Sequence, residues 1–435
     1  MTSINDLLNK ISDFNCVVDG KEIVFPGILQ EENGNIILNA KFPLEQYRKI
    51  GIEDDIVVLG EVSGRKATLM GCHITSASCT IGVNDISIHA VPNEIIVGGC
   101  FSSTPMAKRI IVSTPDLNYM FFGTSLLKPN VDISKDNPSV LNYTFPKPII
   151  ANDKYGEIQI SQSFGVQWTV NYYKHNIISK IEYSFTTSLS LMDAVAKVTA
   201  ARSLFSFFGN GYISFGDITF EIDGEENVYG LWLNYKEDIP AVNEPFLIET
   251  SAFENQFQKV WDAWLNLYES ANPIPNLFYK IICNRSTRVN GFLNLSQAIE
   301  VYSNAFRNKQ ATETAKNDPD NKSKNKEIKL IHRYQDILKE YNGVLELIEP
   351  NIVDYAKGLS NVRNYYTHYN SSKYVEPSYD ELFAASHILR FVLLTIVYTA
   401  VGIPLDCILE CKKRVVFSRF DDDTEVIMKY SKKKK

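Results

Sequence analysis

The chain of 435 residues has 45% hydrophobic and 22% charged residues, which is typical of a globular protein of two or three domains and excludes a wholly disordered chain. Its net charge of −7 is unevenly distributed. The first 250 residues carry 18 basic and 29 acidic side chains, whereas residues 251–435 carry 26 basic and 22 acidic side chains. The more basic second part fits a nucleic-acid partner. The amino-terminal sequence does not read as a secretory signal, and the longest apolar stretch, near 388–401, is shorter than the roughly 20 residues that span a bilayer, so we expect a soluble cytoplasmic protein without a membrane partner.

The first 250 residues are expected to form a β-rich domain. Short segments rich in Val, Ile and Leu, separated by Gly, Asn and Asp, predict antiparallel strands. These segments lie at 22–25, 34–40, 55–60, 66–74, 86–90, 95–101, 158–163, 166–173, 180–185, 213–222 and 229–233. Their spacing favours a sandwich or barrel, and one helix over 190–208 interrupts it and ends at Gly209.

The cysteines are Cys16, Cys72, Cys79, Cys100, Cys283, Cys407 and Cys411. There are seven of them, an odd number scattered over a long chain, which does not indicate a disulfide framework. Cys72, His73 and Cys79 would offer metal ligands, but no CxxC pair accompanies them. We interpret these thiols as small buried hydrophobes, and we expect no metal site.

After about residue 250 the apolar residues recur at helical spacing, so residues 251–435 are expected to form an all-α bundle with its core at about 290–402. The expected helices lie at 253–268, 293–307, 328–341, 344–366 and 379–401, with a short one opened by Pro404. We interpret the polar stretch 309–326 as a surface loop, and 415–420 with 425–428 as a closing hairpin. The fold class is therefore α+β, with an antiparallel β-rich domain followed by a helical one.

One segment, LSNVRNYYTHYN at 359–370, contains a candidate for catalysis. Arg363 and His368 lie about 140° apart on an ideal helix, whereas Asn364 and His368, at i and i+4, share a face, so that Asn364 would orient the imidazole. Histidine transfers protons near neutral pH, and arginine binds phosphate through planar, bidentate contacts. RNA supplies its own 2′-hydroxyl nucleophile, so these residues suit metal-independent RNA cleavage, although a solvated helix face has the same spacing.

Other residues are weaker candidates. Tyr365, Tyr366 and Tyr369 would stack on RNA bases or pack inside the protein. Glu300 is polar amid apolar neighbours. It is either part of the same RNA site, where it would orient Arg363, or an ordinary surface residue. Phosphate-loop, dinucleotide and GxSxG or HExxH patterns do not occur, so no cofactor is expected.

The segment 359–370 resembles the R-N-x-x-x-H form of the HEPN motif. Two helical segments, FENQFQKVWDAWLNLYE and FLNLSQAIEVYSNAFR, resemble the ApeA-like HEPN family, and the β-rich half resembles that family's N-terminal domain. Members of the family are bacterial antiphage proteins thought to act by abortive infection.

The resemblance implies an endoribonuclease with Arg363 and His368 as its catalytic pair, with Asn364 beside them. It further implies a homodimer formed through the HEPN domain, a substrate such as tRNA or another cellular RNA, an unidentified phage trigger, and a sensory or regulatory role for residues 1–250. The alternative is a non-catalytic sensor and dimerisation protein whose HEPN domain binds RNA or protein.

Overall fold

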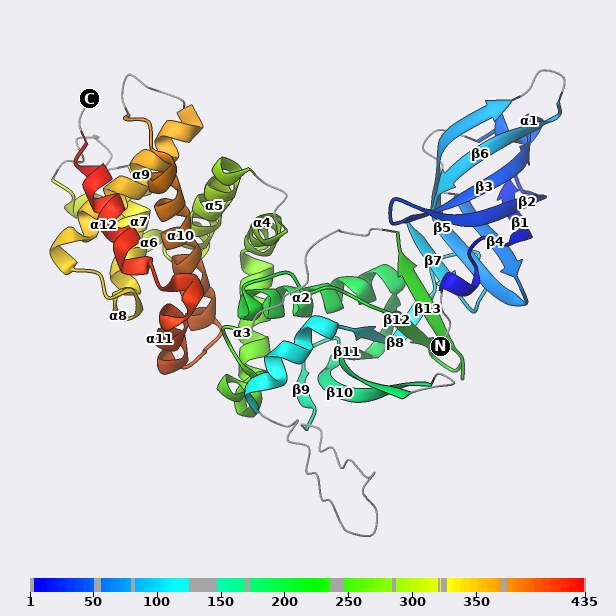
Figure 1. The fold of residues 1–435 in the computed structure, drawn as a ribbon, viewed down its shortest axis with the longest axis horizontal. Helices are drawn as coiled ribbons and strands as arrows, with labels where there is room; N and C mark the ends of the chain where they lie inside the picture. Colours follow the sequence, from blue (N-terminus) through cyan, green and yellow to red (C-terminus); the bar gives the residue numbers. More distant parts are fainter. Residues whose placement is uncertain are drawn as a thin grey trace, which may run out of the picture. The chain divides into compact units, whose positions relative to one another are not determined.

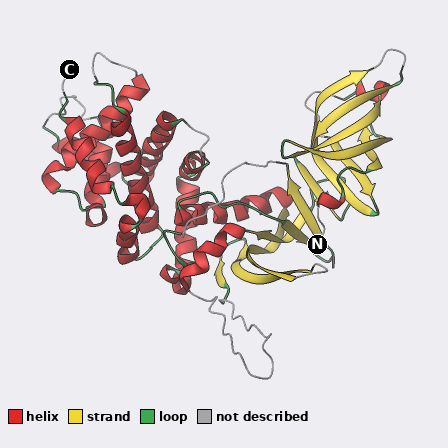
Figure 2. Cartoon of the chain, in the orientation of Figure 1, coloured by secondary structure: helices red, strands yellow, loops and turns green. Residues whose placement is uncertain are grey.

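The chain is an α+β protein, as the sequence predicts, with strands over its first half and helices over its second (Figure 1, Figure 2). The structure is a computed structural model, and it describes residues 4–50, 56–79, 83–124, 147–168, 173–234, 246–283, 287–319, 321, 327–368 and 374–433. It divides into two compact units, which are considered separately below. The barrel unit comprises residues 1–115, 152–199 and 215–238, and the helical unit comprises residues 116–151, 200–214 and 239–435.

Six strands of the barrel unit close on themselves (Figure 1). Their order is β4-β1-β2-β3-β6-β5, and β5 pairs back with β4. The strands are β1 (Ile11–Val18), β2 (Lys21–Glu32), β3 (Asn35–Pro43), β4 (Ile56–Val62), β5 (Arg65–Cys79) and β6 (Asp85–Val91), with the short helix α1 (Leu44–Tyr47) after β3. Phe14, Phe25 and Phe42 pack inside the barrel, where Cys16 and Cys72 are also buried.

A second run of strands extends from β5 in the order β7-β13-β12-β8-β11-β10-β9. They are β7 (Glu94–Val97), β8 (Met106–Ser113), β9 (Ile149–Asn152), β10 (Gly156–Trp168), β11 (Tyr173–Ser190), β12 (Ile218–Ile222) and β13 (Val228–Leu233). The sequence did not predict β1, β8 or β9. Polar residues interrupt the apolar pattern of β1 and β8, and Lys108 and Arg109 lie in the middle of β8.

Helix α2 (Leu191–Gly209) begins in the barrel unit, and its second half belongs to the helical unit. There it packs against α3 (Phe257–Ser270) and α4 (Pro273–Ile282). The rings of Phe207 and Phe278 stack with centroids 4.1 Å apart, and Trp264 Nε1 donates to the Ala200 carbonyl at 2.9 Å. The helical unit therefore includes a core segment from before residue 250.

The rest of the helical unit is a bundle around α10 (Figure 1). Its helices are α5 (Arg288–Phe306), α6 (Asn308–Asn317), α7 (Leu330–Glu340), α8 (Asn342–Leu345), α9 (Ile352–His368), α10 (Tyr379–Ala400), α11 (Leu405–Lys413) and α12 (Phe420–Ser431). Helix α10 is long and apolar enough to cross a membrane, but 72% of its most apolar window is buried inside the protein. Packing in the bundle therefore accounts for its apolar sequence.

Three predictions for this half were wrong. The single helix expected over 344–366 is broken after α8 ends at Leu345, where Glu346 is left-handed with φ 55°, and α9 begins only at Ile352. The expected loop over 309–326 contains α6, because Ala311 and Ala315, one turn apart, are buried and make a narrow apolar face; residues 320 and 322–326 of that stretch lie outside the described part. The expected hairpin at 415–428 is a 3-10 turn, Val415–Phe417, followed by α12. Phe420, Ile427 and Tyr430 are buried at helical spacing, and three aspartates in the first turn of α12 suit a helix N-terminus.

Candidate functional site

The candidate site lies on α9, which continues without a break to His368. Most of the apolar residues of α9 face the bundle, and α7, α12, α5 and α10 pack around the helix. Gly358 marks the closest approach to α12, since a Cβ there would lie 2.7 Å from both Cγ2 and the carbonyl oxygen of Ile427. This packing fixes the rotation of α9 and hence the direction of each side chain of the motif.

Arg363 faces helix α5. Its Nη2 lies 3.4 Å from Oε1 of Glu300, and both side chains are 27% exposed. Arg363 and Glu300, which the sequence suggested as a possible pair, therefore lie in contact. Because the described part of the chain offers the guanidinium no other hydrogen bond or ion pair, most of its donors are available to a ligand.

Glu300 is itself held by two polar residues that sequence reasoning missed. Ser296 Oγ donates to Glu300 Oε1 at 3.5 Å, and the Tyr334 hydroxyl of α7 donates to Ser296 Oγ at 2.8 Å. Ser296 and Tyr334 are each only 1% exposed. A signal for Ser296 existed in the sequence, because it lies four residues before Glu300 and so on the same helix face.

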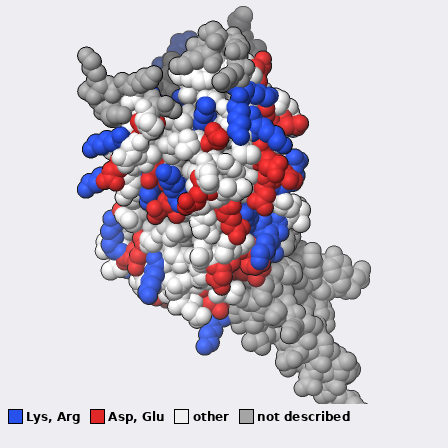
Figure 3. All heavy atoms as spheres, turned by 90° about the vertical axis from the view of Figure 1, so that its left-hand side faces the viewer, with Lys and Arg blue, Asp and Glu red and all other residues white. Residues whose placement is uncertain are grey.

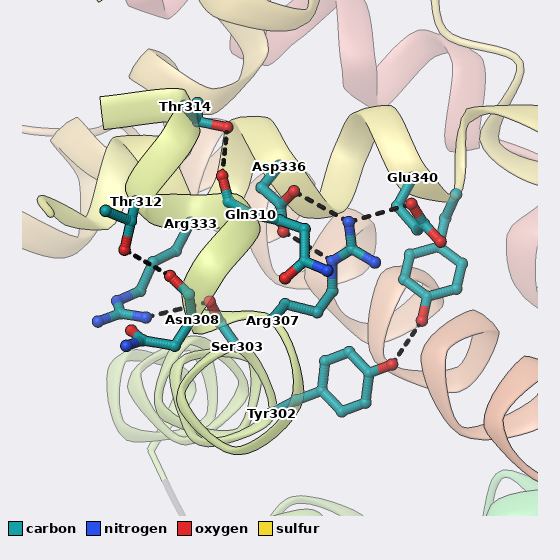
Figure 4. A network of polar contacts seen from close by, with 11 residues as sticks. Tyr302, Ser303, Arg307, Asn308, Gln310, Thr312, Thr314, Arg333, Asp336 and Glu340 are labelled. Carbon is teal, nitrogen blue, oxygen red and sulfur yellow. Dashed lines mark hydrogen bonds and ion pairs between the residues drawn. The ribbon is translucent and has the colours of Figure 1, made fainter. Parts of the chain in front are cut away.

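A second polar network fixes the end of α5 against α7 (Figure 4). Arg307 donates from Nε and Nη2 to the two carboxylate oxygens of Asp336, at 2.7 and 2.9 Å, and also pairs with Glu340 at 3.0 Å. The hydrogen bond to Asp336 raises the pKa of Arg307, which therefore stays charged. Nearby, Tyr302 and Tyr341 share a hydrogen bond of 2.8 Å.

His368 lies in the last turn of α9 and is exposed. The amide nitrogen of Asn364 donates to Ser360 Oγ at 3.3 Å, one turn toward the N-terminus. Among the described residues, no hydrogen bond joins Asn364 to His368, so the structure does not bring this predicted pair together. Arg363 and His368 share the helix, with one turned to α5 and the other at the exposed end.

The tyrosines of the motif differ in burial. Tyr365 is 8% exposed and Tyr366 is half-buried, and their rings meet edge to face with centroids 5.2 Å apart. Burial raises the pKa of Tyr430 on α12, and the nearby Glu381, Tyr366 and Tyr365 raise it further. Tyr365 thus packs beside α12, and base stacking stays a prediction for Tyr366, while Tyr369 lies outside the described residues.

The remaining polar residues give no sign of a metal centre within the described ranges, where no three His, Cys, Asp or Glu side chains cluster in a way that could hold an ion. Burial raises the pKa of Cys72, so its thiol remains protonated inside the barrel. His332 is fully buried, accepts a hydrogen bond from the Lys329 backbone at Nδ1 and faces Asp318 at 2.9 Å. These residues stabilise local structure.

Charge on the helical unit is mixed. Figure 3 shows Lys and Arg interspersed with Asp and Glu over the described atoms of the face that it presents. The excess basic charge of residues 251–435 is therefore not gathered into one patch on that face. Arg363 is more informative than net charge about where an anion would bind.

Two families match the chain by sequence. Residues 14–264 match ApeA N-terminal domain 1, and residues 293–407 match Apea-like HEPN. The second match includes Glu300, Tyr334 and all of α9. No curated protein matches the chain at a significant level.

Proposed function

The chain belongs to the ApeA-like HEPN family, and from this premise we propose that it is a metal-independent RNA endonuclease that acts in bacterial antiphage defence by abortive infection. The observation that carries the proposal is the arrangement on α9, where Arg363 is paired with Glu300 and His368 is exposed on the same helix. An exposed imidazole can supply the proton transfer, and a guanidinium with spare donors the charge stabilisation, that RNA cleavage needs.

In the proposed reaction the 2′-hydroxyl of the RNA attacks the adjacent phosphorus and the 5′-oxygen leaves. His368 transfers a proton to or from these oxygens, a role that typically contributes about 10²- to 10⁴-fold to the rate. Arg363 binds the phosphate oxygens and stabilises the charge that develops on them. The products are a 2′,3′-cyclic phosphate and a 5′-hydroxyl.

We propose further that the protein acts as a homodimer through its HEPN domain in the cytoplasm. A two-fold interface presents the same surface twice, so two α9 helices would place two arginines and two histidines around one phosphate. The barrel unit would then serve as the sensor of a phage trigger or as a restraint on the nuclease. Its separate core and the acidic balance of the first half of the chain support a role distinct from RNA binding.

The test compares RNA integrity after incubation with the purified wild type, Arg363→Ala and His368→Ala. Lys357→Ala and Thr367→Ala are matched controls, because both residues are exposed on α9 and neither is the Arg, Asn or His that defines the motif. We expect the two motif variants to lose about 10²-fold or more in rate while the controls cleave normally. Equal cleavage by all five proteins would refute the assignment.

One observation favours the alternative of a non-catalytic sensor and dimerisation protein. The amide of Asn364 is bonded to Ser360, and nothing in the described residues orients the His368 imidazole. In that case RNA would bind without being cut, and Arg363→Ala would weaken binding. The same panel of variants distinguishes the two functions when both RNA binding and RNA cleavage are measured.

A further inference from the structure

The hydroxyl of Tyr334 lies in the interior of the bundle. The side chain is 1% exposed, and burying a hydroxyl is costly unless it is hydrogen-bonded. Its partner, Ser296, is just as deeply buried and in turn donates to Glu300. A chain of polar contacts therefore runs from the interior of α7, across α5, to the half-buried guanidinium of Arg363 on α9.

We propose that Tyr334 and Ser296 are positioning residues, which hold the carboxylate of Glu300 and through it aim Arg363 at the phosphate of bound RNA. This inference rests on the proposed nuclease function and deepens it. Glu300 is a positioning residue as well, and it contacts Arg363 directly. None of the three needs to touch the substrate.

The charges around Glu300 agree with this arrangement. Arg333 of α7 donates from Nη1 to Ser303 Oγ on α5 at 3.1 Å. Burial lowers the pKa of Arg333, and the charge of Glu300 offsets part of that effect. Burial raises the pKa of Tyr334, and the opposite effects of Glu300 and Arg363 on it place both charges nearby. Glu300 therefore pairs with Arg363 at 3.4 Å and is near enough to Arg333 for its charge to act on that guanidinium, so its carboxylate partly offsets the repulsion between the two cations.

The rigidity needed for such positioning comes from the Arg307 network. Its bidentate contact with Asp336 holds the end of α5 against α7, about three helical turns along α5 from the Ser296–Tyr334 contact. The two outer contacts, 3.5 Å from Ser296 to Glu300 and 3.4 Å from Glu300 to Arg363, are long. Catalytic contacts of this kind are often long without substrate, and a phosphate bound by the free donors of Arg363 would order the guanidinium that Glu300 holds from the other side.

The experiment measures single-turnover RNA cleavage over a range of enzyme concentrations for Tyr334→Phe, Ser296→Ala and Glu300→Gln. Tyr341→Phe is the matched control, because it also removes a buried tyrosine hydrogen bond beside α7 but one that leads to Tyr302. We expect Tyr334→Phe to lower the maximal rate about three- to tenfold, as the loss of one hydrogen bond implies, with the half-saturating concentration unchanged. Glu300→Gln should lose more, and Glu300→Asp should recover part of the loss.

Two results would overturn the inference: a maximal rate for Tyr334→Phe equal to that of the wild type, or equal losses in Tyr334→Phe and Tyr341→Phe. If the wild type cleaves no RNA, the proposed function fails, and a double-mutant cycle on unfolding tests the polar chain by itself. Tyr334→Phe and Arg363→Met should then be coupled, whereas Tyr341→Phe and Arg363→Met should be additive. Additivity in the first pair would overturn the inference with no reference to catalysis.

Discussion

The packing of α9 is open to a sharp test at Gly358. Replacing a glycine inside a helix by alanine normally stabilises the protein by about 0.5–1 kcal/mol, because alanine has less conformational freedom to lose on folding. At Gly358 the added Cβ would instead lie 2.7 Å from Cγ2 and from the carbonyl oxygen of Ile427. An ordinary contact begins at 3.4 Å, so α9 or α12 must move by about 0.7 Å.

The two effects have opposite signs, and their magnitudes decide the outcome. The side-chain contact can be relieved by a rotation of Ile427, but the contact with its carbonyl oxygen cannot, because that atom belongs to the backbone of α12. Overpacking of this kind typically costs about 1–3 kcal/mol. After the helix-propensity gain is subtracted, Gly358→Ala should destabilise the protein by roughly 0–2.5 kcal/mol.

The assay is urea unfolding of the full chain, followed by circular dichroism, with Gly343→Ala as the control. Gly343 lies in α8, is exposed, and has nothing within 4 Å of the position of an added Cβ. The control should therefore be neutral or stabilised, and Gly358→Ala should unfold at a lower urea concentration. The same stabilisation in both variants would refute the close contact between α9 and α12.

Three further expectations follow from the same contacts. RNA cleavage should proceed in EDTA and leave a 2′,3′-cyclic phosphate, because the proposed reaction uses His368 and Arg363 alone; strict Mg²⁺ dependence or 5′-phosphate products, read by end labelling, would count against it. Asp336→Ala should cost about 3–5 kcal/mol in urea unfolding, since it leaves Arg307 charged and only 14% exposed, whereas Glu340→Ala, at a side chain that is 49% exposed, should cost about 1 kcal/mol or less. Mixing Arg363→Ala with His368→Ala chains should restore part of the activity if each site draws on two protomers, and confirmed heterodimers without activity would contradict that arrangement.

The sequence was sufficient for much of the fold because burial follows simple periods. In β3, alternate residues from Ile36 to Phe42 face the barrel core, which is the period-2 pattern of a half-buried strand. In α3, Phe257, Val260, Trp261 and Trp264 are buried at helical spacing. Where the apolar face is narrow the pattern fails, and α6, with two buried alanines among ten residues, looked like a loop.

The prediction of a closing hairpin over 415–428 was wrong for a different reason. Val415, Val416 and Phe417 are consecutive β-branched and aromatic residues, which are common in strands, but Val415 is 91% exposed and the segment is a single 3-10 turn. The helical spacing of α12 begins only at Phe420, and its partner surfaces are α10 and, around Gly358, α9, which lies more than fifty residues earlier. Local pattern cannot supply a partner that the rest of the fold provides.

The candidate site, like the fold, could be predicted only in part from the sequence. The motif and its helical spacing identified Arg363 and His368, and the helix phase placed Glu300 among apolar neighbours where a charge needs a partner. The link from Tyr334 to Ser296 depends on how α7 packs on α5, which no spacing within one helix encodes. Asn364 has a neighbour one turn away on either side, Ser360 and His368, and spacing alone does not say that its amide donates to Ser360. Side-chain networks between helices are therefore the part of the site that required the structure.

The geometry of α9 also bears on why this family motif would need two copies of the chain. Arg363 is directed to α5 by a carboxylate whose own position depends on Ser296, so swinging the guanidinium round the helix toward His368 would abandon that support. His368 lies five residues on, at the exposed end of α9, and a five-residue step turns about 140° around a helix axis. Two arginines held in place and two exposed imidazoles can meet at one phosphate if a second α9 approaches across a two-fold axis, and neither chain then has to distort its helix. In such a dimer each chain would hold its own Arg363 in place through Glu300 before RNA binds. The guanidinium would then be ordered by folding, and RNA binding would not have to order it, which is how the Glu300 contact would assist catalysis.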